Sequence, residues 1–264
     1  ITEDGQMHRM FASVFTDDVS IVGQRQKDID FLVAGLKAEF GIKICNAEHM
    51  LGLVRKPSAD GKSVTISMPA YITGVYKIFE KDMISTRVPK TPLAPGTFLT
   101  RASIDPNNPP TADSYPQYGK LVGCVLWICR MARPDIACAV HMLCRMMGVP
   151  TPEAWAAGLH LVAFLYATKD MGVKMTCPKG TPRVSTWYDA SNKADQGARG
   201  RTVGGFVIYI GDSPIEWLSK LLTHASQSAQ HSEYQALAMA CKGTMWIRHL
   251  VADMGFASWV SLPT

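Results

Sequence analysis

The sequence predicts an α+β protein in which short hairpins alternate with amphipathic helices. Three stretches carry this prediction. Residues 11–23 read as two strands around a tight turn, residues 27–39 repeat apolar side chains with helical spacing, and residues 184–250 read as three strands followed by one long helix. A hydrophobic content of 47% and a charged content of 19% are typical of a globular chain and exclude a disordered one.

Two adjacent carboxylates stand at the first turn. Asp17 and Asp18 separate an alternating apolar segment from a β-branched one that ends at Gly23. Like charges at a hairpin tip repel each other, and no glycine is adjacent that would allow a type I′ turn. The pair is therefore either a solvated acidic turn or a site for a cation. Two magnesium ions would neutralise it and would support two-metal phosphoryl transfer.

The segments after this hairpin alternate between helix and strand. Apolar spacing predicts a helix over 27–39 that stops before Gly41. The elements expected next are a short strand at 42–44, a strand at 50–55 with Gly52 inside it, a turn at 57–61, a strand at 64–68, and a helix over 70–82 that follows Pro69.

The middle of the chain changes from a proline-rich stretch to helices. Residues 85–114 hold prolines at 89, 92, 95, 106, 109 and 110, which predicts a linker or an extended surface loop. Residues 115–148 become helical, with Pro134 in the first turn of a second helix. Thr151 caps a third helix that runs to about Lys169, and a short strand follows at 172–175.

A second pair of carboxylates lies near the end of the chain. A strand from Val184 ends with Asp189, two further strands at 204–210 and 214–218 complete an antiparallel meander, and a helix over 226–250 carries Glu233. With the Asp on the first, central strand and the Glu on a helix packed over it, the two could hold magnesium ions that position water against an RNA phosphodiester. The alternatives are a strand-end cap for Asp189 and an exposed helix charge for Glu233.

The net charge of +5 is concentrated in one part of the chain. Residues 120–183 hold eight basic residues against three acidic ones, which leaves nineteen of each elsewhere. A local basic excess suits a polyanion, and ordinary surface solvation explains it equally well. Lys120, Arg130 and Arg133 are the candidate nucleic-acid contacts, although Arg133 could instead hold the helix junction by pairing with a carbonyl or a carboxylate.

The cysteines and the apolar runs limit the class of protein. Seven cysteines with no Cys-x-x-Cys spacing favour buried free thiols in a reducing compartment over a zinc site or a disulfide framework. No run reaches the roughly 18 uncharged apolar residues of a membrane helix. The chain opens with Ile1 in polar residues, which suggests a fragment of something longer.

Several of these segments, in this order, resemble copia/Ty-type LTR retrotransposons. Phe15-Thr-Asp-Asp18 resembles the aromatic-x-Asp-Asp motif of reverse transcriptases, and the most specific match begins at Tyr118 with Tyr-Gly-Lys-Leu-Val-Gly and continues with Ala-Arg-Pro-Asp-Ile-Ala. Tyr-Asp-Ala-Ser around Asp189 and His-Ser-Glu-Tyr around Glu233 are similar to the family's ribonuclease H region. Weaker matches in the same order are Phe40-Gly41, Leu51-Gly52 and Tyr71-Ile72.

The same comparison shows two departures from the family pattern. Asp189-Ala-Ser-Asn192 stands where the family usually has Asp-Ala-Asp-Trp, and Gln230-His-Ser-Glu233 keeps one Glu where the family often has two. The family also takes a third polymerase carboxylate from a strand upstream of the Asp-Asp hairpin and further ribonuclease H aspartates from beyond the long helix. Both sites are therefore expected to be incomplete in this chain.

The resemblance implies a fold and a domain order. It implies the end of a reverse-transcriptase palm, a helical connecting region, and a ribonuclease H-like domain truncated after its first helix. The corresponding ranges are 1–84 for the palm and the hairpin and helix that follow it, 85–114 for a proline-rich linker, 115–183 for a helical thumb or connection, and 184–264 for the partial ribonuclease H-like domain.

The resemblance also implies a function. The parent would be an RNA-directed DNA polymerase with ribonuclease H activity, with Asp17, Asp18, Asp189 and Glu233 as catalytic and metal-binding residues and two Mg²⁺ ions per site, for which Mn²⁺ could substitute. Its partners would be an RNA template, a DNA primer, RNA–DNA hybrids, dNTPs and the rest of the Pol polyprotein, with no membrane. It would act inside the cell, in the cytoplasm, a virus-like particle or the nucleus. A degenerate remnant that at most binds nucleic acid, and a scaffolding protein, are the other hypotheses.

Overall fold

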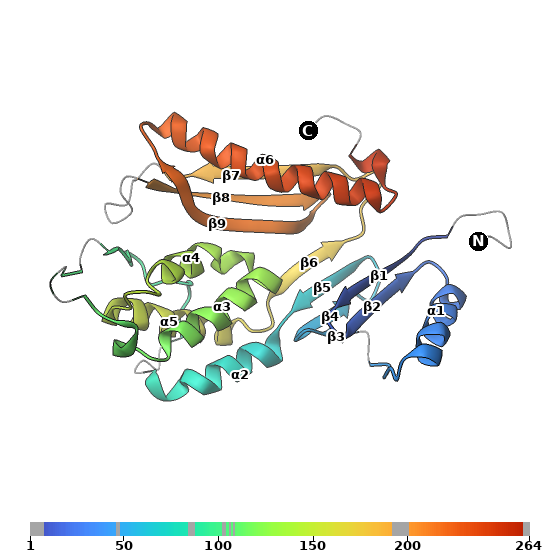
Figure 1. Ribbon diagram of the computed structural model, residues 1–264, viewed down its shortest axis with the longest axis horizontal. Helices are drawn as coiled ribbons and strands as arrows, with labels where there is room; N and C mark the ends of the chain where they lie inside the picture. Colours follow the sequence, from blue (N-terminus) through green and yellow to red (C-terminus); the bar gives the residue numbers. More distant parts are fainter. Residues whose placement is uncertain are drawn as a thin grey trace. The chain divides into compact units, whose positions relative to one another are not determined.

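A computed structural model describes residues 8–45, 48–83, 88–101, 104, 105, 107, 109–191 and 201–260. The chain is an α+β protein that divides into two compact units, Ile1–Arg55 and Lys56–Thr264 (Figure 1). Asn192, where the sequence departs from the family pattern, and parts of the proline-rich stretch 85–114 lie outside the described residues.

The first unit is built on the predicted hairpin. Strands β1 (Met10–Phe15) and β2 (Asp18–Gly23) form a two-stranded antiparallel sheet, and α1 (Gln26–Glu39) contacts β2, so the predicted hairpin and helix are confirmed. No described residue between His8 and Arg55 is fully buried. Val14 is 68% exposed and Phe31 83% exposed, so this unit presents apolar side chains to solvent.

The predicted strand over 50–55 is interrupted. The chain forms a hairpin of β3 (His49–Met50) and β4 (Leu53–Pro57) around Leu51 and Gly52, whose φ angles are 54° and 77°. Two consecutive residues with positive φ reverse the chain as a two-residue hairpin loop requires, which the apolar pattern could not show. The strand predicted at 42–44 was wrong, because residues 41–45 form no strand.

The second unit begins with a small sheet and a helix. Strand β5 (Ser63–Ser67) pairs antiparallel with β6 (Gly172–Thr176), a strand that follows the helices, and α2 (Pro69–Phe79) continues into the 3-10 turn η1 (Glu80–Asp82). Both predicted strands and the predicted helix are therefore confirmed. Their pairing across the helical region was not predicted, because strand partners distant in sequence leave no local signal.

The helical region has the predicted helices, which are α3 (Tyr118–Ala132), α4 (Ala137–Arg145), preceded by the 3-10 turn η4 (Pro134–Ile136), and α5 (Pro152–Ala167). The 3-10 turn η3 (Ala112–Ser114) lies in the stretch predicted as a linker. The Thr151 hydroxyl accepts the Ala154 N–H at 3.2 Å and caps α5 as predicted. The buried hydroxyl of Tyr118 donates to the Leu143 carbonyl at 2.8 Å and ties α3 to α4.

Arg133 is buried at the junction between α3 and α4. Its side chain is 1% exposed and makes a bidentate pair with Asp135, with Nε to Oδ1 at 2.8 Å and Nη2 to Oδ2 at 2.7 Å. Nη1 donates to the Thr168 carbonyl at 3.0 Å, and Nη2 to the Thr168 hydroxyl at 2.9 Å. Arg133 was expected either to contact nucleic acid or to hold the helix junction. The contacts observed are those of a residue that holds the junction.

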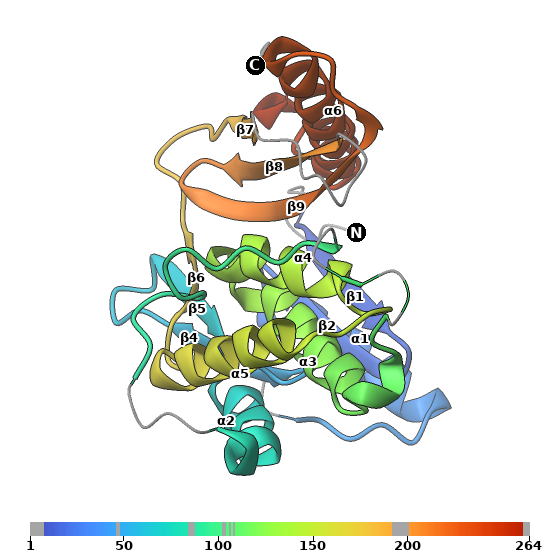
Figure 2. The same cartoon turned by 90° about the vertical axis from the view of Figure 1, so that its left-hand side faces the viewer.

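The last part of the chain is a sheet covered by a long helix. Strands β7 (Val184–Ala190), β8 (Arg201–Ile210) and β9 (Ser213–Ala225) form the predicted antiparallel meander, followed by α6 (Ala229–Asp253) and the 3-10 turn η6 (Ala257–Trp259). In the two views, α6 lies on one face of this sheet and the helical region on the side of the other (Figures 1 and 2). The buried core under α6 consists of Val184, Phe206, Ile208, Ala240, Ile247 and Val251.

One expectation for this sheet was wrong. The strand that carries Asp189, β7, is an edge of the described sheet, and β8 is its central strand. A meander places sequential strands side by side, so the second of three must be the middle one.

Two expectations from composition have different outcomes. No helix in the described part of the chain is long and apolar enough to cross a membrane. The seven cysteines are free, as predicted, but they are not generally buried. Cys129 is buried, whereas four of the thiols are exposed, namely Cys45, Cys138, Cys177 and Cys241.

We expect Arg133→Met to lower the free energy of unfolding by about 2 kcal/mol or more, because it removes two hydrogen bonds to Asp135 and two to Thr168. The matched control is Arg130→Met on the exposed side of α3, which should stay within about 0.5 kcal/mol of the wild type. Urea unfolding of both variants measures the difference. Equal stability of the two variants would contradict the structural role of Arg133.

Candidate functional site

Asp17 and Asp18 stand at the exposed tip of the first hairpin. Phe15 pairs with Asp18, so Thr16 and Asp17 form the two-residue loop and Asp18 opens β2. Both carboxylates are exposed, and within the described residues neither makes a hydrogen bond or an ion pair. Two adjacent carboxylates without a counter-charge are the kind of oxygen ligand that magnesium accepts.

The residue before this pair has a strained backbone. Thr16 has a φ of 53°, in the left-handed region, which a β-branched side chain disfavours. Such strain costs of the order of 1–3 kcal/mol and is concentrated at functional sites in proteins. A glycine would take up this conformation freely, so the loop is not built from the residue that a hairpin turn prefers.

Arg55 connects the hairpins of this unit. Its Nη1 donates to the Ser20 hydroxyl at 3.2 Å, and its Nη2 lies 3.3 Å from the Met50 sulfur. Ser20 lies on β2, two residues after Asp18, so this contact links β4 to the strand that carries the carboxylate pair. Sequence reasoning did not identify Arg55, because nothing local in its pattern shows which strand it reaches.

The second pair of carboxylates comes from the end of β7 and the start of α6. Glu233 lies in the second turn of α6, and its Oε1 accepts the backbone N–H of Ala190 at 3.3 Å. Ala190 is the residue after Asp189 in sequence, and it packs against Ala236 of α6. Because side chains alternate along a strand, Asp189 lies on the opposite face of β7, where it is exposed.

Polar side chains at the start of α6 hold this end of the helix. The Ser228 hydroxyl accepts the His231 N–H at 3.1 Å as an N-cap, and Gln235 Oε1 accepts the His224 N–H of β9 at 3.3 Å. The Gln235 amide also lies 3.2 Å from His231 Nε2. Sequence reasoning missed Gln235 and His224, although the i, i+4 spacing of His231 and Gln235 on a helix was visible.

Neither carboxylate pair forms a complete metal cage. No group of three or more His, Cys, Asp or Glu side chains that could hold a metal ion occurs among the described residues. The donor chemistry of each pair suits Mg²⁺, which binds through one or two carboxylates and keeps several waters. The donor chemistry of each carboxylate therefore suits magnesium as one ligand of a larger set.

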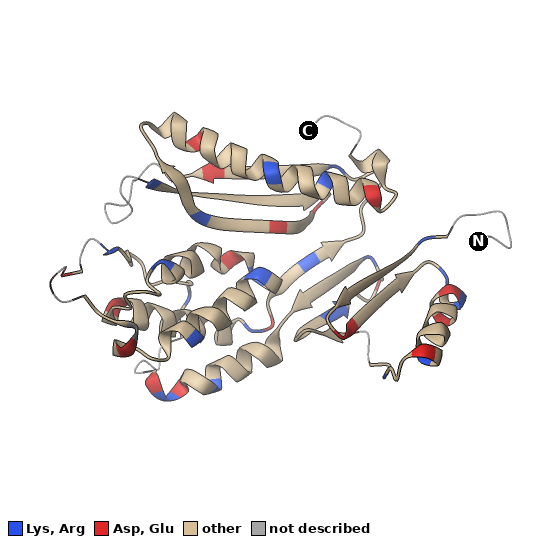
Figure 3. Cartoon of the chain, viewed as in Figure 1, with Lys and Arg blue, Asp and Glu red and all other residues tan. Residues whose placement is uncertain are grey.

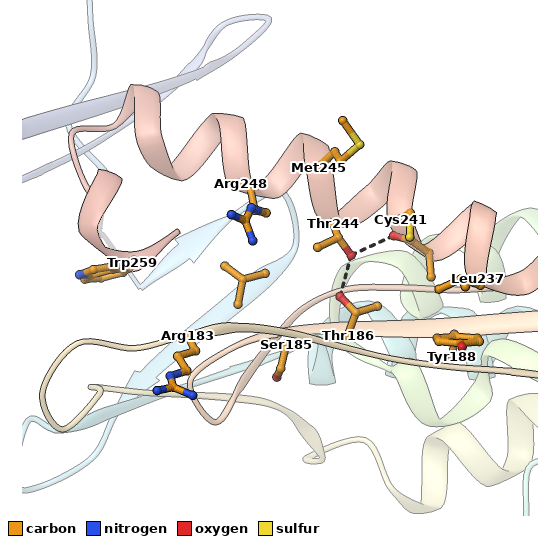
Figure 4. Close-up of a pocket in the computed structure, with 12 residues that line it drawn as sticks. Arg183, Ser185, Thr186, Tyr188, Leu237, Cys241, Thr244, Met245, Arg248 and Trp259 are labelled. Carbon is orange, nitrogen blue, oxygen red and sulfur yellow. Dashed lines mark hydrogen bonds between the residues drawn. The ribbon is translucent and has the colours of Figure 1, made fainter. Parts of the chain in front are cut away.

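A groove of about 640 Å³ separates β7 from the middle of α6 (Figure 4). The hydroxyls of Thr186 and Thr244, two of its lining residues, share a hydrogen bond of 2.6 Å that joins the strand to the helix. Arg183, Arg248 and Trp259 line one part of it. Neither Asp189 nor Glu233 is among the described residues that line the groove, so it is distinct from the carboxylate pair.

The basic residues that the structure describes are spread over many elements. Figure 3 shows that Lys and Arg positions are spread along the helices and strands. Lys120 and Arg130 are exposed on α3, whereas Arg133 is buried and engaged with Asp135. Gly123 lies between the first two on the exposed side of α3, and a Cβ atom added there would meet nothing within 4 Å.

No family model matches the chain. Its relatives over most of its length are copia-type retrotransposon Pol polyproteins. It is 27% identical over 248 residues to the retrovirus-related Pol polyprotein from transposon RE1 of Arabidopsis thaliana, which covers 93% of this chain and 16% of that protein. The chain therefore spans about a sixth of the length of such relatives.

Two shorter relatives match nearly the same span. A putative transposon Ty5-1 protein of Saccharomyces cerevisiae is 26% identical over 223 residues, which covers 84% of this chain and 68% of that protein. An uncharacterized mitochondrial protein of Arabidopsis thaliana is 23% identical over 241 residues, covering 90% of this chain and 94% of that protein. The mitochondrial relative is thus of about the same length as this chain.

We expect Thr16→Gly to slow amide hydrogen exchange in residues 10–23, because glycine adopts the positive φ without strain. The stabilisation should be about 1 kcal/mol, or roughly a fivefold lower exchange rate. Thr16→Ala, which keeps the strain, is the matched control and should change little. Faster exchange in the glycine variant than in the alanine variant would show that the loop is not strained.

Proposed function

We propose that this chain is a segment of an RNA-directed DNA polymerase with ribonuclease H activity from a copia-type retrotransposon. The observation that carries the proposal is the hydrogen bond between Glu233 and the Ala190 N–H, which holds a helix carboxylate at the end of the strand that carries Asp189. The Pol polyprotein relatives support the same reading of the parent protein.

In this proposal, Asp189 and Glu233 hold Mg²⁺ for the cleavage of RNA in an RNA–DNA hybrid, and Asp17 and Asp18 hold Mg²⁺ for nucleotide addition. When bound, the metal would activate the attacking oxygen and stabilise the leaving one. Mn²⁺ is the expected substitute. The protein itself orients these carboxylates. The Ala190 N–H holds Glu233 Oε1 in place, and the hairpin sets the spacing of Asp17 and Asp18.

The nucleic acid would lie along the exposed side of α3. Lys120 and Arg130 would contact phosphates, which provides affinity without sequence preference. Gly123 supports this placement, because a glycine inside a helix costs about 1 kcal/mol relative to alanine and no described side chain packs into the space it leaves. A backbone of nucleic acid could approach closely at that point.

We expect Glu233→Gln to reduce Mg²⁺-dependent cleavage of an RNA–DNA hybrid by at least about a hundredfold in the full-length protein, because the charge that holds the metal is lost. The amide oxygen can still accept the Ala190 N–H, so the melting temperature should be unchanged. Asp253→Asn, at the exposed end of α6, is the control. Unchanged cleavage with Glu233→Gln would reject the proposed role of this residue.

Binding of the hybrid should weaken steeply with salt, because phosphate contacts release counterions. Lys120→Ala and Arg130→Ala should each lower the slope of log affinity against log salt by about one. Fluorescence anisotropy over a salt series measures both slopes. Salt-dependent binding without cleavage in the full-length protein would indicate a non-catalytic remnant, and a flat response in the wild type would leave a scaffolding role.

A further inference from the structure

Trp217 connects the β7–β9 sheet to the helical region. It lies in the middle of β9, and its indole N–H donates to the carbonyl of Cys129 in α3 at 2.9 Å. Trp217 is 8% exposed and Cys129 is 4% exposed, so this hydrogen bond is buried. Its neighbour Leu218 packs with the core under α6, so by alternation Trp217 points away from α6.

The acceptor is a carbonyl that α3 leaves without its usual donor. Arg133 N–H, which is four residues beyond Cys129, bonds the Ile128 carbonyl instead, because the helix ends at Ala132. Carbonyls in the last turn of a helix need partners from elsewhere, and a buried one without a partner is destabilising. Trp217 supplies that partner from a strand far along the chain.

A second contact lies on the same strand. The Ser213 hydroxyl accepts the Thr176 N–H at 2.8 Å and lies 3.3 Å from the Thr176 carbonyl, to which it donates. The covalent connection between β6 and β7 runs through Pro178, Gly180 and Pro182 and is largely exposed. The position of the β7–β9 sheet on the helical region is therefore held by the packing of β9 against β6 and α4, and not by this connection.

We propose that Trp217 is a positioning residue that fixes the β7–β9 sheet on α3. The sheet carries Asp189, and α3 carries Lys120 and Arg130, so a duplex held along α3 would meet Asp189 at one spacing. The role of this spacing in cleavage rests on the proposed function. The hydrogen bond between Trp217 and Cys129 does not depend on that function, because both residues belong to this protein.

The test is Trp217→Phe, which keeps the ring and removes the donor. The control is Trp187→Phe, because Trp187 lies in the same sheet and its side chain is 72% exposed. Burial raises the pKa of the Cys129 thiol to about 11, so at pH 8 this thiol is protonated and should react only when the connection opens. Labelling by iodoacetamide, followed residue by residue by mass spectrometry, reports that opening.

In Trp217→Phe we expect Cys129 to be labelled about tenfold faster, and calorimetry to resolve two unfolding transitions where the wild type has one. Trp187→Phe should match the wild type in both. A single transition at lower temperature, with Cys144 labelled faster by the same factor as Cys129, would show a merely structural role and overturn the proposal. If Trp217→Phe does not fold, Ser213→Ala should show the same selective labelling of Cys129, and its absence would equally overturn it.

Cleavage of a hybrid with a recessed end gives the functional readout. In full-length Trp217→Phe the cuts should spread over several phosphates, while the total rate stays within about twofold of the wild type. If the wild type and Trp217→Phe both cut at the same single position, the proposed role of Trp217 in setting the cleavage position is overturned. A wild type that does not cleave would reject the proposed function, and the thiol labelling would still decide whether Trp217 holds the sheet.

Discussion

The packing of α6 against the β7–β9 sheet is the interaction on which the candidate ribonuclease site depends. Glu233 reaches the end of β7 only because α6 crosses the sheet closely. Gly243 allows that approach, since a Cβ atom there would lie 3.0 Å from the Ile208 side chain and 3.3 Å from Phe206. The resulting core brings together a strand and a helix that are more than forty residues apart, and it places the Glu233 carboxylate where it accepts the Ala190 N–H.

The two units of the chain differ in how many of their side chains are buried. The second unit has a continuous set of buried side chains in its helices and a further core under α6, whereas the first has no fully buried residue in its described part. A hairpin and a helix alone bury too little apolar surface to be stable on their own. The acidic tip at Asp17 and Asp18 is therefore carried by the less protected unit, and the pair of Asp189 and Glu233 by the better packed one.

Polar groups inside the second unit act as connections between elements. Arg133 joins the end of α3 to the end of α5 through Asp135 and Thr168, and Trp217 joins the same end of α3 to β9. Both donate to backbone carbonyls at helix ends, where the regular helical pattern of donors stops. These two buried polar side chains thus hold helix ends. One of them, Arg133, lies in the segment that matches the family most specifically.

Sequence alone determined the order of the helices α1–α6 and of the β7–β9 meander, the capped start of α5 by Thr151, and the four carboxylates that carry chemical interest. These follow from local rules, because spacing, capping and turn residues act over a few positions. Tertiary structure decided the rest. It placed β7 at an edge of the described sheet, broke the strand at Leu51 and Gly52, and brought Glu233 to Ala190, because contacts between distant segments are set by packing and leave no local pattern.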